Sequence, residues 1–320
     1  MKRPVRIVGQ GMAGSMLAWH CERAGIDFEL IDRGHALAAS RVGAGLVSPL
    51  TGKRLAPTWR FAEWRDEVLA MYRKLESELG LPLVREMKIR RFYRDADQRA
   101  FFERRIDKPE IAAWVDRLDD DGLWLNGALQ VETGALIAAL RERWLQSGRM
   151  VEGTVPTDVE GPKIWCVGAE PMPIRGIPWE PSRGELITGQ LAGLEQDVVL
   201  NDGKWLLPMG DGSVRVGSTF DRDDLVPRPT VKGQTELREA AERLAGRLLE
   251  GAVGDAGLRV ALPDRRPVMG WVDDEGSQGV FAGLAAKGAL WAPALAQQWV
   301  ADGLVGAKLD AEVRVGRFLG

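Results

Sequence analysis

The chain has 320 residues, of which 45% are hydrophobic and 28% charged, so it is long enough for about two globular domains. A formal net charge of −3 gives no basic excess, which argues against a nucleic-acid-binding protein. Two cysteines (Cys21, Cys166) and two histidines (His20, His35) exclude a disulfide scaffold and a cysteine- or histidine-rich metal centre, so we expect no metal site.

The first residues do not have the pattern of a targeting segment. The apolar run Val5–Val8 is interrupted by Arg6 and ends at Gly9, whereas a signal peptide needs about 7–15 apolar residues in a row. No uninterrupted apolar stretch approaches the ~18 residues of a membrane span. We therefore predict a cytoplasmic protein with reduced thiols and no integral membrane segment.

A glycine-rich turn lies between a predicted strand and a predicted helix. Val5–Val8 predicts a short strand, residues 9–14 read GQGMAG, and a helical apolar pattern follows and ends at a glycine C-cap, Gly25. Residues 28–31 predict a second strand that ends at Asp32, 21 residues beyond the middle glycine. A lone GxGxxG is weak evidence, but in this context it predicts a dinucleotide-binding βαβ unit.

Each residue of this unit has a physical task. Gly9 allows the sharp turn out of the strand, Gly11 lets a pyrophosphate approach the backbone, and Gly14 allows close packing of helix on strand. The helix N-terminus offers free N–H groups to phosphates, and Asp32 can accept hydrogen bonds from ribose hydroxyls. The alternative is a glycine turn that binds nothing, but we expect a bound adenine dinucleotide.

Beyond Asp32 the chain departs from the pattern of a nicotinamide-dependent dehydrogenase, in which further strand–helix units would follow. Instead we predict a small-residue loop at 39–49, a helix at 59–79, a strand at 87–94, a helix at 134–146, a buried strand at 163–167, strands over 183–219 with a turn at Asp211 and Gly212, a helix at 235–250, and a helix that begins near Pro293. A stripe of Trp291, Leu295 and Trp299 on the last helix predicts core packing.

Several of these segments form an ordered set of glycine-containing motifs. The motifs lie at residues 9–32, 39–46, 127–148, 183–186, 211–219, 257–270 and 283–294. Their order and spacing resemble those of the D-amino-acid oxidase/glycine oxidase-like family of FAD-dependent oxidoreductases, and the resemblance covers most of the chain. It implies an α/β fold: a Rossmann-like FAD-binding domain with a discontinuous α+β substrate domain on a mixed, mainly antiparallel sheet. The implied division is residues 1–60, 126–172 and 256–320 for the FAD-binding domain, and residues 61–125 and 173–255 for the substrate domain.

The resemblance also implies FAD as the cofactor, bound non-covalently because no cysteine lies near the C-terminus. The residues that it places at the cofactor are Gly9, Gly11, Met12, Ala13, Gly14, Asp32, Arg33, Ser40, Arg41, Ala44, Gly45, Leu46, Val155, Gly168, Gly283, Ala286, Lys287, Gly288 and Ala289.

The reaction implied by the resemblance is oxidation of a C–N bond in an amine or amino acid, by hydride transfer from the substrate Cα to flavin N5. Arg259 matches the family's substrate arginine and would hold a carboxylate by a two-point contact; the alternative is a surface arginine paired with Asp264. Lys287 would lie beside the flavin pyrimidine and stabilise negative charge at N1; the alternative is a solvated lysine. Oxygen or another acceptor would take the electrons.

Departures from the family pattern leave the substrate open. Leu284 replaces a histidine common in the closing motif, and Tyr72 and Tyr93 do not match the family's active-site tyrosines. Two further groups could serve a substrate or simply be surface residues. They are the cluster Lys53, Arg54, Trp59, Arg60 and Trp64, and the pair Asp223 and Asp224.

Two other functions are compatible with the sequence. The family includes the oxidoreductase half of a bifunctional tRNA wobble-uridine enzyme, and such a role would need a basic patch. The only small basic cluster is Lys88, Arg90, Arg91 and Arg94. The other function is a flavin-binding protein without turnover. We expect a small-molecule partner rather than a nucleic acid, and the sequence does not define an oligomeric state.

Overall fold

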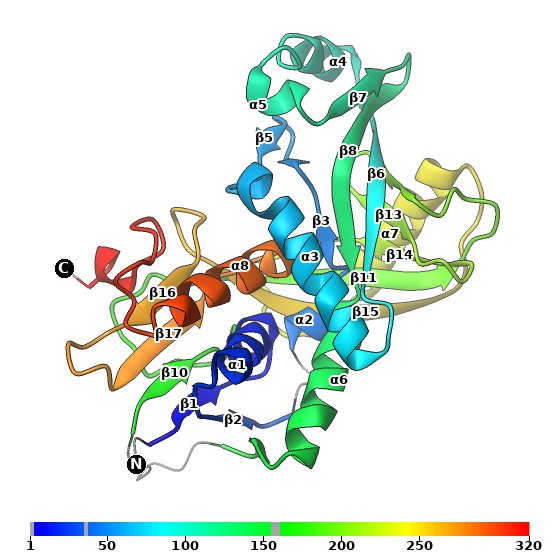
Figure 1. Ribbon diagram of the computed structural model, residues 1–320. Helices are drawn as coiled ribbons and strands as arrows, with labels where there is room; N and C mark the ends of the chain where they lie inside the picture. Colours follow the sequence, from blue (N-terminus) through cyan, green and yellow to red (C-terminus); the bar gives the residue numbers. More distant parts are fainter. Residues whose placement is uncertain (1–2, 35–37, 155–160, 320) are drawn as a thin grey trace.

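The computed structural model describes residues 3–34, 38–154 and 161–319, and it contains two large sheets (Figure 1). The first sheet has six strands in the order β16-β17-β10-β1-β2-β9. Their bounds are β1 Val5–Val8, β2 Phe28–Asp32, β9 Met150–Glu152, β10 Lys163–Trp165, β16 Val268–Trp271 and β17 Gln278–Ala282. The strands from β17 to β9 are parallel and only the edge strand β16 runs antiparallel, as in a Rossmann-like domain.

The second sheet has nine strands and is mainly antiparallel. Its order is β15-β11-β14-β13-β12-β6-β8-β3, with β7 beside β8, and only β12 and β6 pair in parallel. The bounds are β3 Leu46–Val47, β6 Val84–Phe92, β7 Val115–Leu118, β8 Gly122–Val131, β11 Glu180–Gln190, β12 Val198–Asn201, β13 Trp205–Pro208, β14 Ser213–Gly217 and β15 Glu250–Ala261. The predicted fold class is confirmed. The predicted domain boundaries at 126 and 256 fall inside β8 and β15, and the division into domains stays a prediction.

The helices lie over the six-stranded sheet and around the nine-stranded one (Figure 1). Their bounds are α1 Met12–Ala24, α2 Ala39–Val42, α3 Phe61–Leu79, α4 Ala96–Glu103, α5 Pro109–Ala112, α6 Thr133–Gln146, α7 Val231–Ala245 and α8 Gly288–Ala301, with a short 3-10 turn at Val315–Arg317 and a hairpin of β4 Leu50–Thr51 and β5 Ala56–Pro57. Among the described helices, none combines the length and the apolarity that a membrane span requires.

Two predicted elements need correction. The small-residue segment at 39–49 is not a continuous loop, because it forms the short helix α2 and strand β3. Helix α8 begins at Gly288 rather than near Pro293, which lies inside the helix. A proline removes the N–H that would bond the carbonyl four residues earlier. Here the Tyr72 hydroxyl of α3 donates to that carbonyl, Ala289 O, at 2.7 Å, so the helix continues through Pro293.

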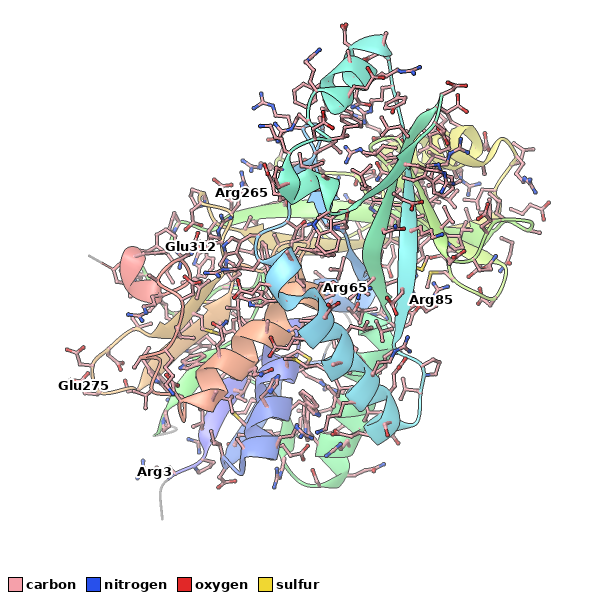
Figure 2. The ribbon with its side chains drawn as sticks, turned by 45° about the horizontal axis from the view of Figure 1, so that its top comes forward. Arg3, Arg65, Arg85, Arg265, Glu275 and Glu312 are labelled. Carbon is pink, nitrogen blue, oxygen red and sulfur yellow. The ribbon has the colours of Figure 1, made fainter. Side chains whose placement is uncertain are left out.

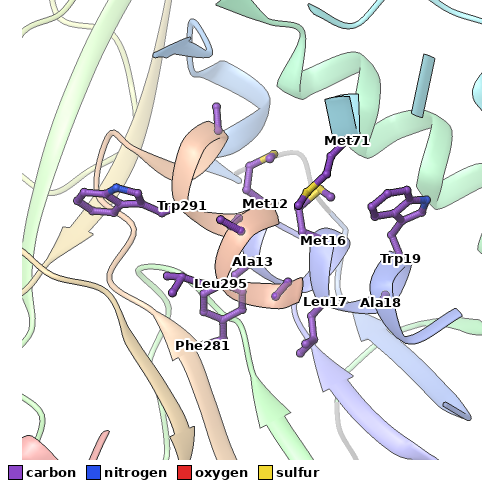
Figure 3. Packing of buried hydrophobic residues seen from close by; sticks show 14 of the residues in the cluster. Met12, Ala13, Met16, Leu17, Ala18, Trp19, Met71, Phe281, Trp291 and Leu295 are labelled. Carbon is purple, nitrogen blue, oxygen red and sulfur yellow. The ribbon is translucent and has the colours of Figure 1, made fainter. Parts of the chain in front are cut away.

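The main core lies between α1, α3, α8 and the six-stranded sheet (Figure 3). Figure 3 shows Met16 of α1 beside Met71 of α3, and Met12 of α1, Leu295 of α8 and Phe281 of β17 belong to the same buried cluster. Trp291, Leu295 and Trp299 are all buried, which confirms the predicted packing stripe. Helix α3 joins this core to the second sheet: Arg65, labelled in Figure 2, pairs with Glu86 of β6 at 2.5 Å.

Candidate active site

A cavity of about 410 Å³ lies where elements of the two sheets meet. Its walls come from the start of α1, α2 with β3, the turn after β4, strands β6, β8, β11 and β15, and residues 284–289 before α8. The predicted residues that line it are Met12, Ser40, Ala44, Gly45, Leu46, Arg259, Ala286, Lys287, Gly288 and Ala289. The fold therefore brings together residues from four distant parts of the sequence.

Other predicted cofactor residues lie along one edge of the six-stranded sheet. Gly9 follows β1, Asp32 ends β2, Gly168 lies just beyond β10, and Gly283 follows β17. These four strands are parallel neighbours, so their carboxyl ends share an edge, which is where open α/β sheets bind ligands. Val155 lies outside the described residues.

The glycines of the βαβ unit are required by close backbone contacts. Gly9 has φ +98°, and a Cβ there would lie 2.7 Å from the Cys166 carbonyl oxygen. A Cβ on Gly14 would overlap the Gly9 carbonyl, so this glycine lets α1 approach β1, as predicted. Gly45 has φ +66°, and its Cβ would overlap the Val131 carbonyl of β8.

The N-termini of α1 and α8 meet at the cavity. A Cβ on Gly288 would lie 3.4 Å from the Cβ of Met12, and both residues belong to the first turns of their helices. The Met12 N–H donates to the Ser40 hydroxyl at 3.1 Å, while a Cβ on Gly11 would lie 3.4 Å from the same hydroxyl oxygen. Two positive helix ends favour an anionic group at this point.

Asp32 is held by three donors, two of which are backbone amides. Its Oδ2 accepts from the Gln10 N–H at 2.8 Å, and its Oδ1 accepts from the Gly34 N–H at 2.8 Å and from Arg141 Nη1 at 3.0 Å. A carboxylate offers about four acceptor positions, so one is left for a ribose hydroxyl. Arg141 on α6 also contacts Glu152 at 2.6 Å.

Gln10 and Arg141 were not among the predicted residues. Gln10 donates through its backbone N–H, which leaves no signal in the residue type, and Arg141 lies far from Asp32 in the chain. Three of the remaining predicted residues lie beside this edge. Ala13 is buried in the first turn of α1, Arg41 lies on α2, and Arg33, next to Asp32, pairs with Glu170.

Arg259 lies on β15 and faces the cavity. Its Nη1 donates to the Ser218 hydroxyl at 3.2 Å and its Nη2 to the Thr219 carbonyl at 2.9 Å, while its buried Nε has no hydrogen-bond partner. No carboxylate pairs with Arg259 among the described residues, and burial lowers its pKa. Asp264, the alternative partner considered above, pairs with Arg317 at 2.8 Å instead, so that alternative is wrong.

Gly184 of β11 makes room for the Arg259 guanidinium. The two strands pair antiparallel, and a Cβ on Gly184 would overlap Nη2 of Arg259. A glycine inside a strand often marks such a close approach, and this signal in the sequence could have identified Gly184 as a site residue.

Lys287 is half-buried in the cavity wall at the N-terminus of α8. Burial lowers its pKa from 10.5 to about 8, so it is still mostly protonated at pH 7. No acidic side chain forms an ion pair with Lys287 among the described residues. A cation and a helix N-terminus thus occupy the same side of the cavity.

Of the predicted Lys/Arg/Trp cluster, only Lys53 lines the cavity. Trp59 packs edge-to-face on Trp64 at 5.0 Å between ring centroids, and Arg60 pairs with Glu63 at 2.5 Å. Asp224 pairs with Arg183 away from the cavity wall.

The predicted basic cluster is divided by the alternation of β6. Arg90 pairs with Asp119 at 3.2 Å, Arg91 is buried and lines the cavity, and Lys88 is exposed. These residues therefore do not form one basic surface patch.

A comparison with protein families decides the family of this chain. A family model described as FAD dependent oxidoreductase matches residues 5–302. The chain belongs to this family. The match extends over nearly the whole of the FAD-dependent oxidoreductase, from β1 to the residue after α8, and confirms the resemblance inferred from the motifs.

Relatives of this FAD-dependent oxidoreductase include an oxidase of similar length and a longer bifunctional protein. It is 26% identical to a glycine oxidase of Pseudomonas aeruginosa, over 92% of this chain and 93% of the relative. It is 31% identical to the tRNA 5-methylaminomethyl-2-thiouridine biosynthesis bifunctional protein MnmC of Maricaulis maris, over 98% of this chain but only 54% of that protein. The solved structure of iminodiacetate oxidase from Chelativorans sp. BNC1 has the same fold, with a TM-score of 0.77, 22% identity and 98% coverage of both chains.

Proposed function

We propose that this FAD-dependent oxidoreductase oxidises the C–N bond of an amine or amino acid, and that Arg259 holds the substrate carboxylate. The observation that carries the proposal is the position of Arg259: its guanidinium faces a cavity that also contains the predicted cofactor residues, and no carboxylate pairs with it among the described residues. The names of the glycine oxidase and iminodiacetate oxidase relatives support a substrate of this class.

The residues present fit FAD bound without a covalent link. A Cβ on Gly11 would fill the space in front of Ser40, and the N-terminal amides of α1 other than the Met12 N–H, which bonds Ser40, are available for a pyrophosphate. Asp32 keeps an acceptor position for a ribose hydroxyl. We propose that Ala44–Leu46 and residues 286–289 hold the ring system. Both described cysteines, Cys21 and Cys166, are buried in the core rather than in the cavity lining.

When bound, FAD supplies the acceptor for the hydride that leaves the substrate Cα. The protein's own groups would orient the substrate and stabilise charge. Arg259 fixes the carboxylate, and the hydrogen bonds to Ser218 and Thr219 hold the guanidinium in place. Lys287 and the N-terminus of α8 stabilise negative charge that develops on a group bound against them.

The proposal is tested by the visible spectrum of the purified protein, recorded anaerobically before and after amino acids, N-alkyl amino acids and simple amines are added. We expect flavin bands that bleach with amino acids or N-alkyl amino acids. Bands that stay unchanged with every compound would contradict oxidation of this substrate class. Re-admission of oxygen then shows whether oxygen restores the oxidised spectrum.

A second candidate is oxidation of an amine on a tRNA nucleoside. The observation that favours it is the 31% identity to the MnmC relative, although the chain spans about half of that protein. An RNA substrate would bind in a salt-dependent manner, because phosphate contacts release counterions. Bleaching of the flavin by tRNA, but by no free amino acid, would favour this candidate.

A further inference from the structure

The cavity lining contains more positive than negative side chains. It has five cationic side chains, Lys53, Arg91, Arg94, Arg259 and Lys287, and two acidic ones, Glu185 and Asp202. The proposed reaction gives a task to Arg259 and Lys287 only. Lys53, Arg91 and Arg94, called here the distal cations, have no assigned task.

The two acidic residues do not neutralise the distal cations, because their carboxylates are engaged elsewhere. Glu185 accepts hydrogen bonds from the backbone N–H of Thr230 at 2.7 Å and from its hydroxyl at 2.9 Å. Asp202 Oδ2 accepts from Nε of Arg243 at 2.7 Å. The lining therefore has a net positive charge.

Arg91 is the most buried of the distal cations. It is 7% exposed, it lies on the same face of β6 as Ile89, and its Nη2 donates to the Gly52 carbonyl at 2.5 Å. Burial and then the nearby charge of Arg94 lower its pKa to about 10. No ion pair with an acidic residue is formed by Arg91 within the described part of the chain. A buried cation without a counterion is costly, so an anionic ligand at this position would be favourable.

Arg94 lies close by at the end of β6. Its Nε donates to the Asp202 backbone carbonyl at 2.5 Å, and it forms no ion pair with a carboxylate among the described residues. Its neighbours outside the cavity differ, since Arg90 pairs with Asp119 at 3.2 Å and Arg99 with Glu103 at 2.9 Å. Arg91 and Arg94 thus both face the cavity and lack an acidic partner within the described residues.

We infer that the distal cations bind a second anionic group of the substrate, a carboxylate or a phosphate. This inference rests on the proposed function, in which Arg259 binds the first carboxylate. Strand β6, which carries Arg91, and strand β15, which carries Arg259, are separated by four strands in the sheet order. The apolar side chains of Ile89 and Leu125 line the same cavity. The substrate class is therefore an amino acid with a second anion at the end of a methylene-containing side chain or N-substituent.

Binding of unreactive acids to the purified holoenzyme tests the inference without turnover. Succinate, glutarate and adipate are compared with butyrate by calorimetry and by the perturbation of the flavin spectrum, and 3-phosphonopropionate tests a phosphate-like second anion. We expect at least one dianion to bind about tenfold more tightly than butyrate, because it gains a charge-assisted contact. Whether glutarate or the phosphonate binds more tightly shows whether the second anionic group is a carboxylate or a phosphate.

Variants of the distal cations assign the effect to these residues. Arg91→Met, Arg94→Met and Lys53→Met should each reduce the preference for the dianion and leave butyrate binding unchanged. Arg54→Met is the matched control, because Arg54 is an exposed neighbour of Lys53 that does not line the cavity. If Arg91→Met does not fold, the exposed Arg94 and Lys53 still provide the test.

Equal affinity for succinate, glutarate, adipate, 3-phosphonopropionate and butyrate would overturn the inference, as would a dianion preference that survives all three variants. Tighter binding of tRNA than of every dianion would also overturn it and favour a nucleic-acid substrate. Failure of the proposed function gives a different result. In that case amino acids would not bleach the flavin, while dianions would still bind in a manner that depends on the distal cations.

Discussion

The guanidinium of Arg259 lies directly over Gly184, in the space that a Cβ at residue 184 would fill. The two residues belong to neighbouring antiparallel strands, β15 and β11, and Arg259 Nη2 lies 3.5 Å from the carbonyl oxygen of Arg183. The absence of a side chain at residue 184 thus determines where the guanidinium of Arg259 can lie.

Gly184→Ala should displace this guanidinium and weaken carboxylate binding. We expect KM for amino acids to rise about tenfold to a hundredfold, with a smaller change for simple amines that lack a carboxylate. Steady-state kinetics with matched acid and amine substrates measure the difference. In the double variant Gly184→Ala/Arg259→Met, the alanine should add little to the effect of the methionine, because both changes remove the same contact. Fully additive effects would contradict the coupling.

Gly11→Val should abolish retention of FAD while the fold survives. Gly11 has φ −91°, which other residues adopt, so the valine would block the space in front of Ser40 rather than strain the backbone. The ratio of flavin to protein after gel filtration measures retention. Gly316→Val is the control, because nothing lies within 4 Å of a Cβ at that position. Flavin that co-purifies unchanged with Gly11→Val would refute this placement of the pyrophosphate.

Lys287→Met should make the flavin-free protein more stable at neutral pH. Burial lowers the pKa of Lys287 to about 8, below its value of 10.5 when unfolded, so folding is penalised while the side chain is protonated in both states. The penalty is complete below about pH 8 and fades as the pH rises toward 10.5. We expect a gain on the order of 1 kcal/mol at pH 7 that shrinks at pH 10, measured by urea unfolding.

The control for this prediction is Lys232→Met, which replaces an exposed lysine of α7. Its effect on the free energy of unfolding should not change between the two pH values. An equal gain for Lys287→Met at pH 7 and pH 10 would show that burial of the charge is not the cause.

Arg141→Met should lower the free energy of unfolding by about 2–4 kcal/mol and weaken FAD binding. Arg141 is 7% exposed and bonds Gln10, Asp32 and Glu152 at once, and its loss would leave partly buried polar groups without partners. Arg143→Met on the same helix is the matched control. Arg143 is 38% exposed and pairs with Glu22 at 2.8 Å, so its loss should cost under about 1 kcal/mol. Equal losses for the two variants, measured by chemical denaturation, would contradict the account.

The sequence predicted the βαβ unit well because its signals are local. The strand, the glycine turn, the C-cap at Gly25 and the second strand lie within one short segment, and β1, α1 and β2 follow the predicted bounds closely. Helices α3 and α6 also follow their predicted bounds closely. The mixed, mainly antiparallel second sheet was predicted from the family resemblance.

The start of α8 could not be predicted, because it depends on a contact far away in the sequence. Pro293 suggested a first helical turn, but the Tyr72 hydroxyl, 217 residues from Ala289, replaces the hydrogen bond that the proline removes. The contact between Gly184 and Arg259 depends in the same way on the pairing of β11 with β15. Arg91 was within reach of sequence reasoning, since alternation from Met87 and Ile89 places it on the buried face of β6.

The central claim is that Arg259 holds the substrate carboxylate beside the bound cofactor. The most direct measurement is the rate at which the bound flavin is reduced under anaerobic conditions. It is recorded at increasing concentrations of an amino acid that the enzyme oxidises and of the matching amine, for the wild type and Arg259→Met. We predict that the variant retains flavin and that the amino-acid concentration needed for half-maximal flavin reduction rises about a hundredfold or more. The rate of flavin reduction by the amine should fall far less. An equal fall in the rate of flavin reduction by the amino acid and by the amine, or no fall with either, would contradict the claim.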